Sequence, residues 1–347
     1  MLSSLLLTLA LGAGAPHLGL RPLPLPPPPI LSFPAAAIPD IDARSWMVYS
    51  VDQGAELGSK DPDLSMAPAS ITKLMTAILA VERIDLSSNI TISAHADSTP
   101  IGYTGQPDVR TGEVWLAYDL LSNVMVQSGN DASTAIAEAA AGGNAAAFVV
   151  LMNERAAALG MASTNFHNPH GLDNPLHVST ARDLIAMGRA ALDSPQVMRF
   201  ARTKAVTYRV AGRVIPVTAT DRDLGVFPGL LGLKTGDTLN AGQVLLSYTK
   251  TQHDRLVAVV LGTPDRRAAT RELLAWAMTA LGPRDHFFAV VAGTDLAVGF
   301  PAWYQARLEA AGHLPSGKPT IPERTPLTDD LHGAFRLLLP ELLGGDA

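Results

Sequence analysis

The order in which the hydrophobic pattern changes along this chain restricts the fold more than any other feature. A segment at residues 43–52 that predicts a strand is followed by a block of segments with helical spacing: 70–83, 118–127, 131–141, 144–159 and 179–192. The pattern then becomes β-branched and alternating (204–217, 230–235, 241–248 and 255–261), and residues 265–281 return to helical spacing. This order predicts an α/β protein of the α+β type, with an antiparallel sheet flanked by helices.

The N-terminal residues predict export. Residues 1–15 contain a short apolar run followed by Ala13, Gly14 and Ala15, the form of a secretory signal peptide. The run is too short for a transmembrane helix, which needs about 20 apolar residues. Residues 16–39 are rich in proline and predict an extended linker, which is favoured here over a ligand for an SH3-type domain. We therefore expect an extracytoplasmic protein, in the periplasm or cell envelope.

The predicted folded domain covers residues 40–282, and residues 283–347 are interpreted as a small C-terminal appendage of unknown role. Its composition shifts to proline, glycine and scattered charge. An apolar stretch at 335–343 is interrupted by Pro340 and contains a single basic residue, Arg336. Core packing is therefore favoured for this stretch, and a helix associated peripherally with a membrane surface is the alternative.

Composition excludes several classes of function. The net charge is −6 and gives no sign of the basic surface that binds nucleic acid, so we expect no nucleic-acid partner. The chain has no cysteine, which excludes disulfides, zinc–thiolate sites, iron–sulfur clusters and a cysteine nucleophile. Three histidines (His167, His170 and His177) lie within eleven residues, but their spacing matches no zinc signature. We expect neither a metal nor a cofactor.

Three short strings of polar residues stand out: residues 70–73 (SITK), 128–130 (SGN) and 234–236 (KTG). Each pattern alone is weak, because Ser-x-x-Lys recurs at 247–250 and Ser-x-Asn recurs elsewhere. Context separates them. The first string opens a predicted helix, whereas residues 247–250 lie in a predicted strand, where the serine and lysine would not share a face.

The first string has the chemistry of a nucleophile beside its base. Residues three apart on a helix meet side by side, so Ser70 and Lys73 are predicted neighbours. A serine hydroxyl becomes a good nucleophile when a base removes its proton. A lysine serves as that base if burial or a nearby cation lowers its pKa. Lys234 is a candidate for that cation, or for a ligand of a substrate carboxylate.

The other two strings predict the walls of a cleft. Ser128 and Asn130 lie in a loop between two predicted helices, which can project polar groups into a cleft. The string that begins at Lys234 lies on a predicted strand, along whose edge an extended peptide can pair. There, Gly236 would let a substrate backbone approach closely.

In this order, the three strings resemble those of the penicillin-binding proteins and serine β-lactamases. Longer segments resemble the D-alanyl-D-alanine carboxypeptidase branch, the low-molecular-mass penicillin-binding proteins of serine peptidase family S11: residues 68–76, 126–131, 166–172, 179–184 and 232–236. The resemblance covers about residues 43–281. It implies a transpeptidase/β-lactamase-like fold.

The resemblance also implies roles. Ser70 would attack the carbonyl joining two terminal D-alanines, Lys73 would accept its proton, and Ser128 would help to pass a proton to the leaving amine. Substrate-binding roles are implied for Asn130, Lys234, Thr235, Gly236 and Asp237. Within that set, Asn130 would bind the substrate amide, Lys234 and Thr235 would hold the terminal carboxylate, and the backbone N–H groups of Ser70 and Asp237 would bind the oxyanion.

Position 237 departs from the family pattern. This chain has aspartate there, where the family more often has a neutral, aromatic or histidine residue. The oxyanion hole needs only the backbone N–H of this residue. We therefore expect an altered rate or substrate preference rather than loss of activity, unless the carboxylate points away or pairs with a lysine or arginine.

The implied activity is removal of the terminal D-alanine from peptidoglycan stem peptides, with β-lactam antibiotics as covalent inhibitors. A D,D-endopeptidase and a catalytically silent cell-wall binding protein are alternatives. A β-lactamase is a further alternative, but class A enzymes use a glutamate in an E-x-x-L-N context. Between residues 130 and 234 the chain has only Glu138 and Glu154, both in predicted helices. We therefore expect β-lactams to form a slowly hydrolysed adduct.

Overall fold

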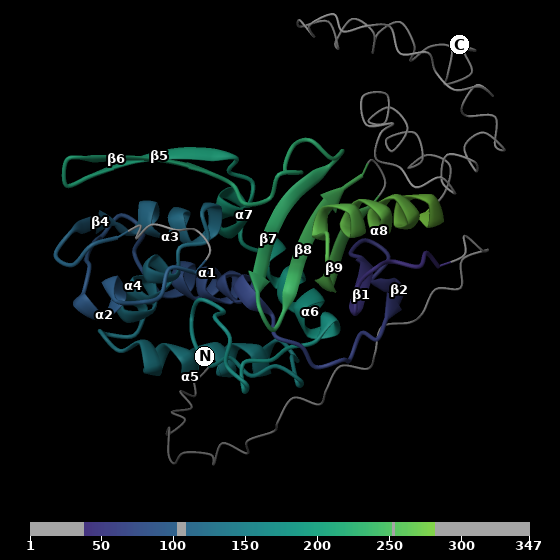
Figure 1. The fold of residues 1–347 in the computed structure, drawn as a ribbon, viewed down its shortest axis with the longest axis horizontal. Helices are drawn as coiled ribbons and strands as arrows, with labels where there is room; N and C mark the ends of the chain where they lie inside the picture. Colours follow the sequence, from purple (N-terminus) through teal and green to yellow (C-terminus); the bar gives the residue numbers. More distant parts are fainter. Residues whose placement is uncertain (1–37, 103–108, 252–253, 282–347) are drawn as a thin grey trace, which may run out of the picture. The chain divides into compact units, whose positions relative to one another are not determined.

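The structure is a computed structural model that describes residues 38–102, 109–251 and 254–281 (Figure 1). The predicted signal peptide (1–15), nearly all of the predicted linker (16–39) and the predicted appendage (283–347) lie outside the described residues.

The described chain is built on a five-stranded antiparallel sheet with the order β2-β1-β9-β8-β7 (Figure 1). Its strands are β1 (Ser45–Ser50), β2 (Ala55–Lys60), β7 (Leu230–Thr238), β8 (Gly242–Lys250) and β9 (Arg255–Thr263). Among the described strands, β1 pairs with β9. The hairpin of β1 and β2 is thereby joined to the meander of β7, β8 and β9, which lies much later in the chain. The predicted antiparallel sheet is confirmed, and β7 is left at its edge.

Helices cover both faces of this sheet. The last helix, α8 (Arg266–Leu281), lies on the face to which Trp46 of β1 points, and the rings of Trp46 and Trp276 meet edge to face at 6.1 Å. Helix α6 (Ala181–Leu192) lies on the opposite face. Arg189 of that helix stacks over Tyr49, three residues after Trp46 in β1. Because side chains alternate along a strand, an odd spacing places the two aromatic rings on opposite faces.

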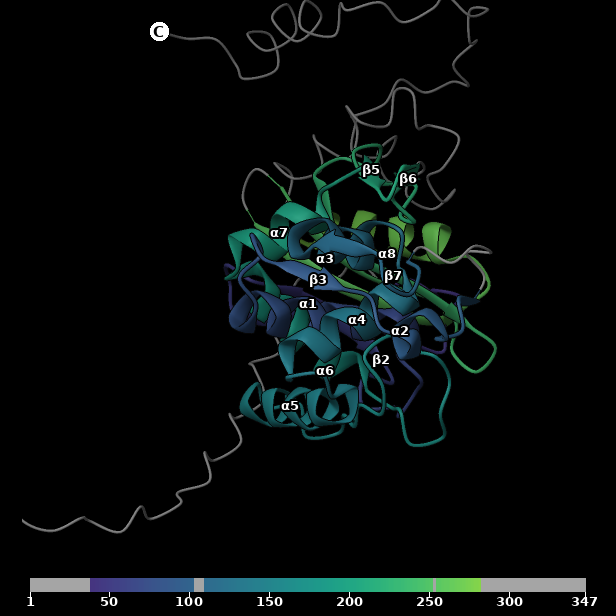
Figure 2. The same ribbon diagram turned by 90° about the vertical axis from the view of Figure 1, so that its left-hand side faces the viewer.

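The helical block forms a second core around α1 (Thr72–Arg83), which lies in the middle of the helices (Figure 2). Its first nine residues are buried. The surrounding helices are α3 (Ala117–Val126), α4 (Asn130–Ala140), α5 (Ala145–Ala158), α6 and α7 (Pro195–Ala201). Of the helices in the described part, none alone is long and apolar enough to cross a membrane, and only the pair α4 and α5, bent by 85°, meets the criteria together.

Short elements account for most differences from the sequence prediction. Residues 204–217, predicted as one strand, form a separate hairpin of β5 (Ala205–Val210) and β6 (Arg213–Thr218). Its two-residue turn has positive φ at both Ala211 and Gly212. Alanine rarely adopts this conformation, so an alanine in a sequence does not predict such a turn. The prediction also omitted β2, α7, β3 (Asn89–Thr91), α2 (Ala94–Asp97) and β4 (Val114–Leu116).

Candidate active site

A tight turn carries the predicted nucleophile. Ser70 lies in a 3-10 turn, η1 (Ala69–Ile71), immediately before α1, rather than in the α-helix itself. Ala69 has a positive φ of 47°, which is costly for a residue with a Cβ. The predicted meeting of the two side chains still occurs, because Lys73 Nζ donates a hydrogen bond to Ser70 Oγ at 2.8 Å.

Lys73 is fully buried, and oxygen atoms from distant segments surround its ammonium group. Lys73 Nζ also donates to Asn130 Oδ1 at 2.7 Å and to the backbone oxygen of His170 at 2.6 Å. A buried cation is costly unless it is hydrogen-bonded. These bonds therefore hold the amine in one position, facing Ser70.

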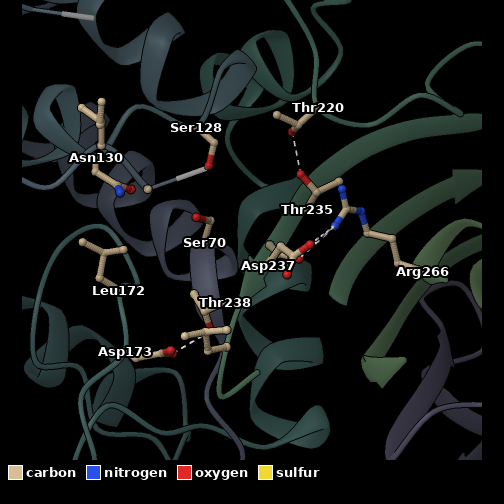
Figure 3. A pocket seen from close by; sticks show the side chains of 14 residues that line it. Ser70, Ser128, Asn130, Leu172, Asp173, Thr220, Thr235, Asp237, Thr238 and Arg266 are labelled. Carbon is tan, nitrogen blue, oxygen red and sulfur yellow. Dashed lines mark hydrogen bonds and ion pairs between the residues drawn. The ribbon is translucent and has the colours of Figure 1, made fainter. Parts of the chain in front are cut away.

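The second string lies on the opposite side of Ser70 from the sheet (Figure 3). Asn130 begins α4, and its Nδ2 donates to the backbone oxygen of Pro100 at 2.9 Å. An amide nitrogen has two protons, so the second one can serve a substrate carbonyl. Ser128 follows the end of α3 with φ of 72°, and its N–H donates to the backbone oxygen of Asn123 at 3.1 Å.

The third string lies on the edge strand β7. Lys234 is 2% exposed, and its Nζ donates to the backbone oxygen of Thr235 at 3.1 Å. Burial lowers the pKa of Lys234 to about 7, and the nearby charge of Arg266 lowers it as well, whereas Asp221 opposes the change. The hydroxyl of Thr235 is hydrogen-bonded to that of Thr220 at 2.5 Å.

Gly236 lies where β7 passes the turn that carries Ser70. A Cβ at this position would lie 2.8 Å from the backbone nitrogen of Ser70 and 2.9 Å from the Cβ of Ala69. From the sequence, this glycine is expected to admit a substrate backbone. The structure shows that it first admits the protein's own turn, which brings the backbone N–H of Ser70 against the strand.

These elements surround a cleft of about 400 Å³ (Figure 3). Ser70 lies at its centre, with Ser128 and Asn130 on one side and Thr235, Asp237 and Arg266 on the other. The lining residues are Ser70, Ile101, Gly102, Ser128, Asn130, Leu172, Asp173, Thr220, Thr235, Gly236, Asp237, Thr238, Leu239 and Arg266. Lys73 and Lys234, the lysines of the first and third strings, do not line the cleft. Both side chains are almost completely buried in the protein behind its wall. The other six of the eight predicted site residues line this one cleft.

The aspartate at position 237 has a partner that no sequence pattern predicts. Asp237 Oδ2 lies 3.6 Å from Arg266 Nη1, and the same nitrogen donates to the backbone oxygen of Gly236 at 3.2 Å. Arg266 begins α8, 29 positions after Asp237 in the chain, and no motif marks it. Thr220 and Asp173, which also line the cleft, were missed for the same reason.

The loop at residues 166–178 forms the floor of the site. Gly171 has φ of 88°, and a Cβ there would lie 1.9 Å from the backbone oxygen of Ala69. His177 Nδ1 accepts from the backbone N–H of His167 at 3.0 Å, and its Nε2 lies 2.8 Å from the hydroxyl of Thr72. The loop therefore supports the turn of Ser70 from below, through one close approach and one buried imidazole.

Two of the three histidines considered as metal ligands, His170 and His177, have other partners for their ring nitrogens. Burial lowers the pKa of His177 to about 4 and that of His170 to about 3, so both rings are neutral at pH 7. His170 Nδ1 accepts from the N–H of Leu172 at 3.2 Å. Within the described ranges, no cluster of three or more histidine, aspartate or glutamate side chains is arranged to hold a metal ion.

Neither glutamate between the second and third strings lines the cleft. Glu138 accepts from Ser93 and lies 2.7 Å from His95 Nδ1, and Glu154 is exposed on α5. The floor loop instead contributes Asp173, whose carboxylate accepts from Thr238 Oγ1 at 2.6 Å and from the N–H of Asn240 at 3.1 Å. The glutamate that class A β-lactamases use therefore has no counterpart among the residues that line this cleft.

The geometry and the fold together define a class of protein. Its members have a transpeptidase-type fold, with a serine, a buried lysine and a second serine at a cleft beside the edge of the sheet. A family model described as D-alanyl-D-alanine carboxypeptidase, peptidase S11, matches residues 33–265. The chain belongs to this family.

Individual relatives agree with that assignment. The chain is 33% identical to D-alanyl-D-alanine carboxypeptidase DacC of Escherichia coli, over 69% of this chain and 62% of that protein. It is 30% identical to D-alanyl-D-alanine carboxypeptidase DacB2 of Mycobacterium tuberculosis, over 65% of this chain and 76% of that protein. Penicillin binding protein 5 of Haemophilus influenzae has the same fold, with a TM-score of 0.66 and 30% identity over 71% of this chain and 73% of that chain.

The chain thus spans less than two thirds of the length of several curated relatives. The matched region contains the sheet, the helical block and every described cleft residue except Arg266, which begins α8.

Gly171 provides a test of how the floor loop supports the turn of Ser70. We expect Gly171→Ala to lower the free energy of unfolding by about 1–3 kcal/mol more than Gly160→Ala, because only the first Cβ collides with backbone. Gly160 is the matched control, since its φ is 76° and nothing lies within 4 Å of the position that a Cβ would take there. Urea unfolding followed by tryptophan fluorescence measures both. Equal losses would contradict the close approach.

Proposed function

We propose that this protein is a serine D-alanyl-D-alanine carboxypeptidase that removes the terminal D-alanine from peptidoglycan stem peptides. The observation that carries this proposal is the 2.8 Å hydrogen bond from the buried Lys73 Nζ to Ser70 Oγ, in a cleft beside the edge strand β7. Membership of the D-alanyl-D-alanine carboxypeptidase family supports it.

In the proposed acylation step, Lys73 accepts the proton of Ser70 as Oγ attacks the carbonyl carbon between the two D-alanines. The Oγ–C bond forms and the C–N bond breaks, and the proton passes to the leaving nitrogen with the help of Ser128. Water then adds to the ester, the Oγ–C bond breaks, and a proton from that water is transferred to Ser70 Oγ. For the first proton transfer, from Ser70, Lys73 must be neutral, and the hydrogen bond is then reversed, with Ser70 Oγ donating to Nζ.

The remaining site residues would position the substrate. An extended peptide would pair along β7, and the second N–H of Asn130 Nδ2 would bind a substrate carbonyl. The backbone N–H groups of Ser70 and Asp237 would bind the oxyanion, where such donors contribute strongly to catalysis. Lys234 and Thr235 would hold the terminal carboxylate, the threonine through its hydroxyl and the buried lysine through its charge behind the strand. Thr220 would orient the hydroxyl of Thr235.

The setting of the substrate favours an extracytoplasmic location, because peptidoglycan stem peptides lie outside the cytoplasmic membrane. The predicted signal peptide at residues 1–15 agrees with this location and stays a prediction. Peripheral membrane association through residues 335–343 stays an alternative.

A D,D-endopeptidase would use the same chemistry on cross-linked peptides. Purified muropeptides distinguish the two activities, since released D-alanine identifies the carboxypeptidase and monomerised cross-links identify the endopeptidase. A silent binding protein is disfavoured by the arrangement of Lys73 against Ser70, which a protein without catalysis would not need.

Covalent labelling tests the nucleophile. We expect fluorescent penicillin to label the protein and labelling to disappear in Ser70→Ala, because the adduct forms on Ser70 Oγ. Ser87→Ala is the control, since Ser87 is an exposed serine that bonds to Asp85 and does not line the cleft. Gel fluorescence reads both. Labelling that survives Ser70→Ala, or wild-type protein that takes no label, would overturn the proposal.

Turnover of β-lactams tests the comparison with β-lactamases. We expect a chromogenic cephalosporin to give one equivalent of fast hydrolysis followed by a slow phase, because none of the described residues that line the cleft is a glutamate that could activate the deacylating water. Stopped-flow absorbance measures both phases. Rapid continuous turnover would identify a β-lactamase instead.

The pKa of Lys234 predicts a pH dependence. Because this pKa is lowered to about 7, Lys234 is a cation below pH 7 and loses its charge above it. We expect the ratio of kcat/KM for a peptide ending in D-Ala–D-Ala to that for its C-terminal carboxamide to fall as pH rises through about 7. Any pH dependence of the acylation chemistry that the two peptides share cancels in this ratio.

The control for this pH dependence is Lys234→Arg. A guanidinium keeps its charge across this range, so the variant should lose the step in the ratio. A step that persists in Lys234→Arg, or a ratio that does not change with pH in the wild-type protein, would contradict a role of Lys234 in holding the carboxylate.

A further inference from the structure

The pair formed by Asp237 and Arg266 lies on the side of the cleft where the leaving residue would bind. Residues two apart in a strand point to the same face, so the side chain of Asp237 stands beside that of Thr235. Figure 3 shows Thr235, Asp237 and Arg266 together on that side of Ser70. Thr235 is the proposed ligand of the terminal carboxylate, which would therefore lie next to the carboxylate of Asp237.

Within this pair, the anion is the more accessible partner. The side chain of Asp237 is 46% exposed and that of Arg266 is 21% exposed. The guanidinium lies 3.6 Å from the Asp237 carboxylate and also donates to the backbone oxygen of Gly236. Pairing with an arginine does not cancel the effect of this aspartate, because the two charged groups are 3.6 Å apart and Asp237 stays the more exposed of the two. A substrate carboxylate arriving at Thr235 thus meets a cation that is already paired and an anion that lines the cleft.

The other charges near the cleft do not restore a strong cationic site. Among the described residues that line it, the charged side chains are Asp173, Asp237 and Arg266. Asp173 is bonded to Thr238 and Asn240. Lys234 lies behind the wall, with its charge reduced near neutral pH because burial lowers its pKa. The lining therefore carries more negative than positive charge.

We propose that Asp237 sets the charge preference of the leaving-group side, so that leaving residues whose carboxylate is converted to a carboxamide are accepted about as well as those with a free carboxylate. This inference rests on the proposed function. Asp237 is a specificity-determining residue here, since its carboxylate occupies Arg266 and repels a second carboxylate. A carboxamide has no charge to repel, and its N–H groups can donate to Asp237.

The test compares one diacylated L-Lys–D-Ala–D-Ala peptide with the same peptide ending in a carboxamide. For the wild-type protein above pH 7, where Lys234 has lost its charge, we expect kcat/KM for the two to agree within about threefold, because attraction by Arg266 and repulsion by Asp237 nearly cancel. Asp237→Asn should raise the ratio of carboxylate to carboxamide about tenfold, mainly through a lower KM for the carboxylate peptide. Chromatography of released D-alanine and D-alaninamide measures both.

Matched variants separate this effect from a general change in charge. Asp52→Asn also removes one carboxylate from an exposed aspartate–arginine pair, Asp52 with Arg255 at 2.6 Å, but Asp52 does not line the cleft. It should leave the ratio unchanged. Arg266→Gln should lower the ratio, because it leaves Asp237 unpaired. Asp237→His should change the ratio in the same direction as Asp237→Asn, and raised ionic strength should weaken all of these effects.

The outcomes distinguish this inference from the proposed function. A wild-type protein that cleaves neither peptide and takes no fluorescent penicillin overturns both. A wild-type protein that cleaves the carboxylate peptide more than about a hundredfold faster than the carboxamide overturns only the inference. The same holds if Asp237→Asn leaves the ratio unchanged, or if Asp52→Asn changes it equally.

Discussion

The hydrogen bond between Lys73 and Ser70 depends on a buried ammonium group, and much of the fold is arranged to supply that group with acceptors. A lysine with no exposed surface must receive oxygen atoms from the protein, because water cannot provide them. These oxygens come from α4, through Asn130, and from the floor loop, through the backbone of His170. The packing of α1 among the surrounding helices is thus tied directly to the position of the amine that faces Ser70.

Two glycines let the floor and the sheet reach the turn that carries the nucleophile. Gly171 brings the floor loop against the backbone of Ala69, and Gly236 brings β7 against the backbone nitrogen of Ser70. The turn, with its positive φ at Ala69, is held between two pieces of backbone rather than by side chains alone. Backbone contacts of this kind restrict the direction of the Ser70 N–H, which is the group proposed to bind the oxyanion.

The features that could be predicted from the sequence are those written in local patterns. The helix at α1, the strands of the meander and the face shared by Ser70 and Lys73 follow from the spacing of neighbouring residues. The hairpin of β5 and β6 was missed because its turn uses alanine in a left-handed conformation. Arg266 was missed for another reason: it reaches the cleft only because α8 begins beside β7, a tertiary contact with no local signal.

The electrostatics of the site show the same limit of local patterns. A lysine at the start of the third string suggests a cationic strand edge, but the charge on that edge is set by burial and by neighbours from other elements. Burial lowers the pKa of Lys234 to about 7, and Arg266 is paired with Asp237. The motif therefore specifies where a substrate carboxylate would bind, whereas the surrounding fold specifies how strongly that carboxylate is attracted. Proteins that share the motif can thus differ in the leaving group they prefer without any change in the nucleophile or its base.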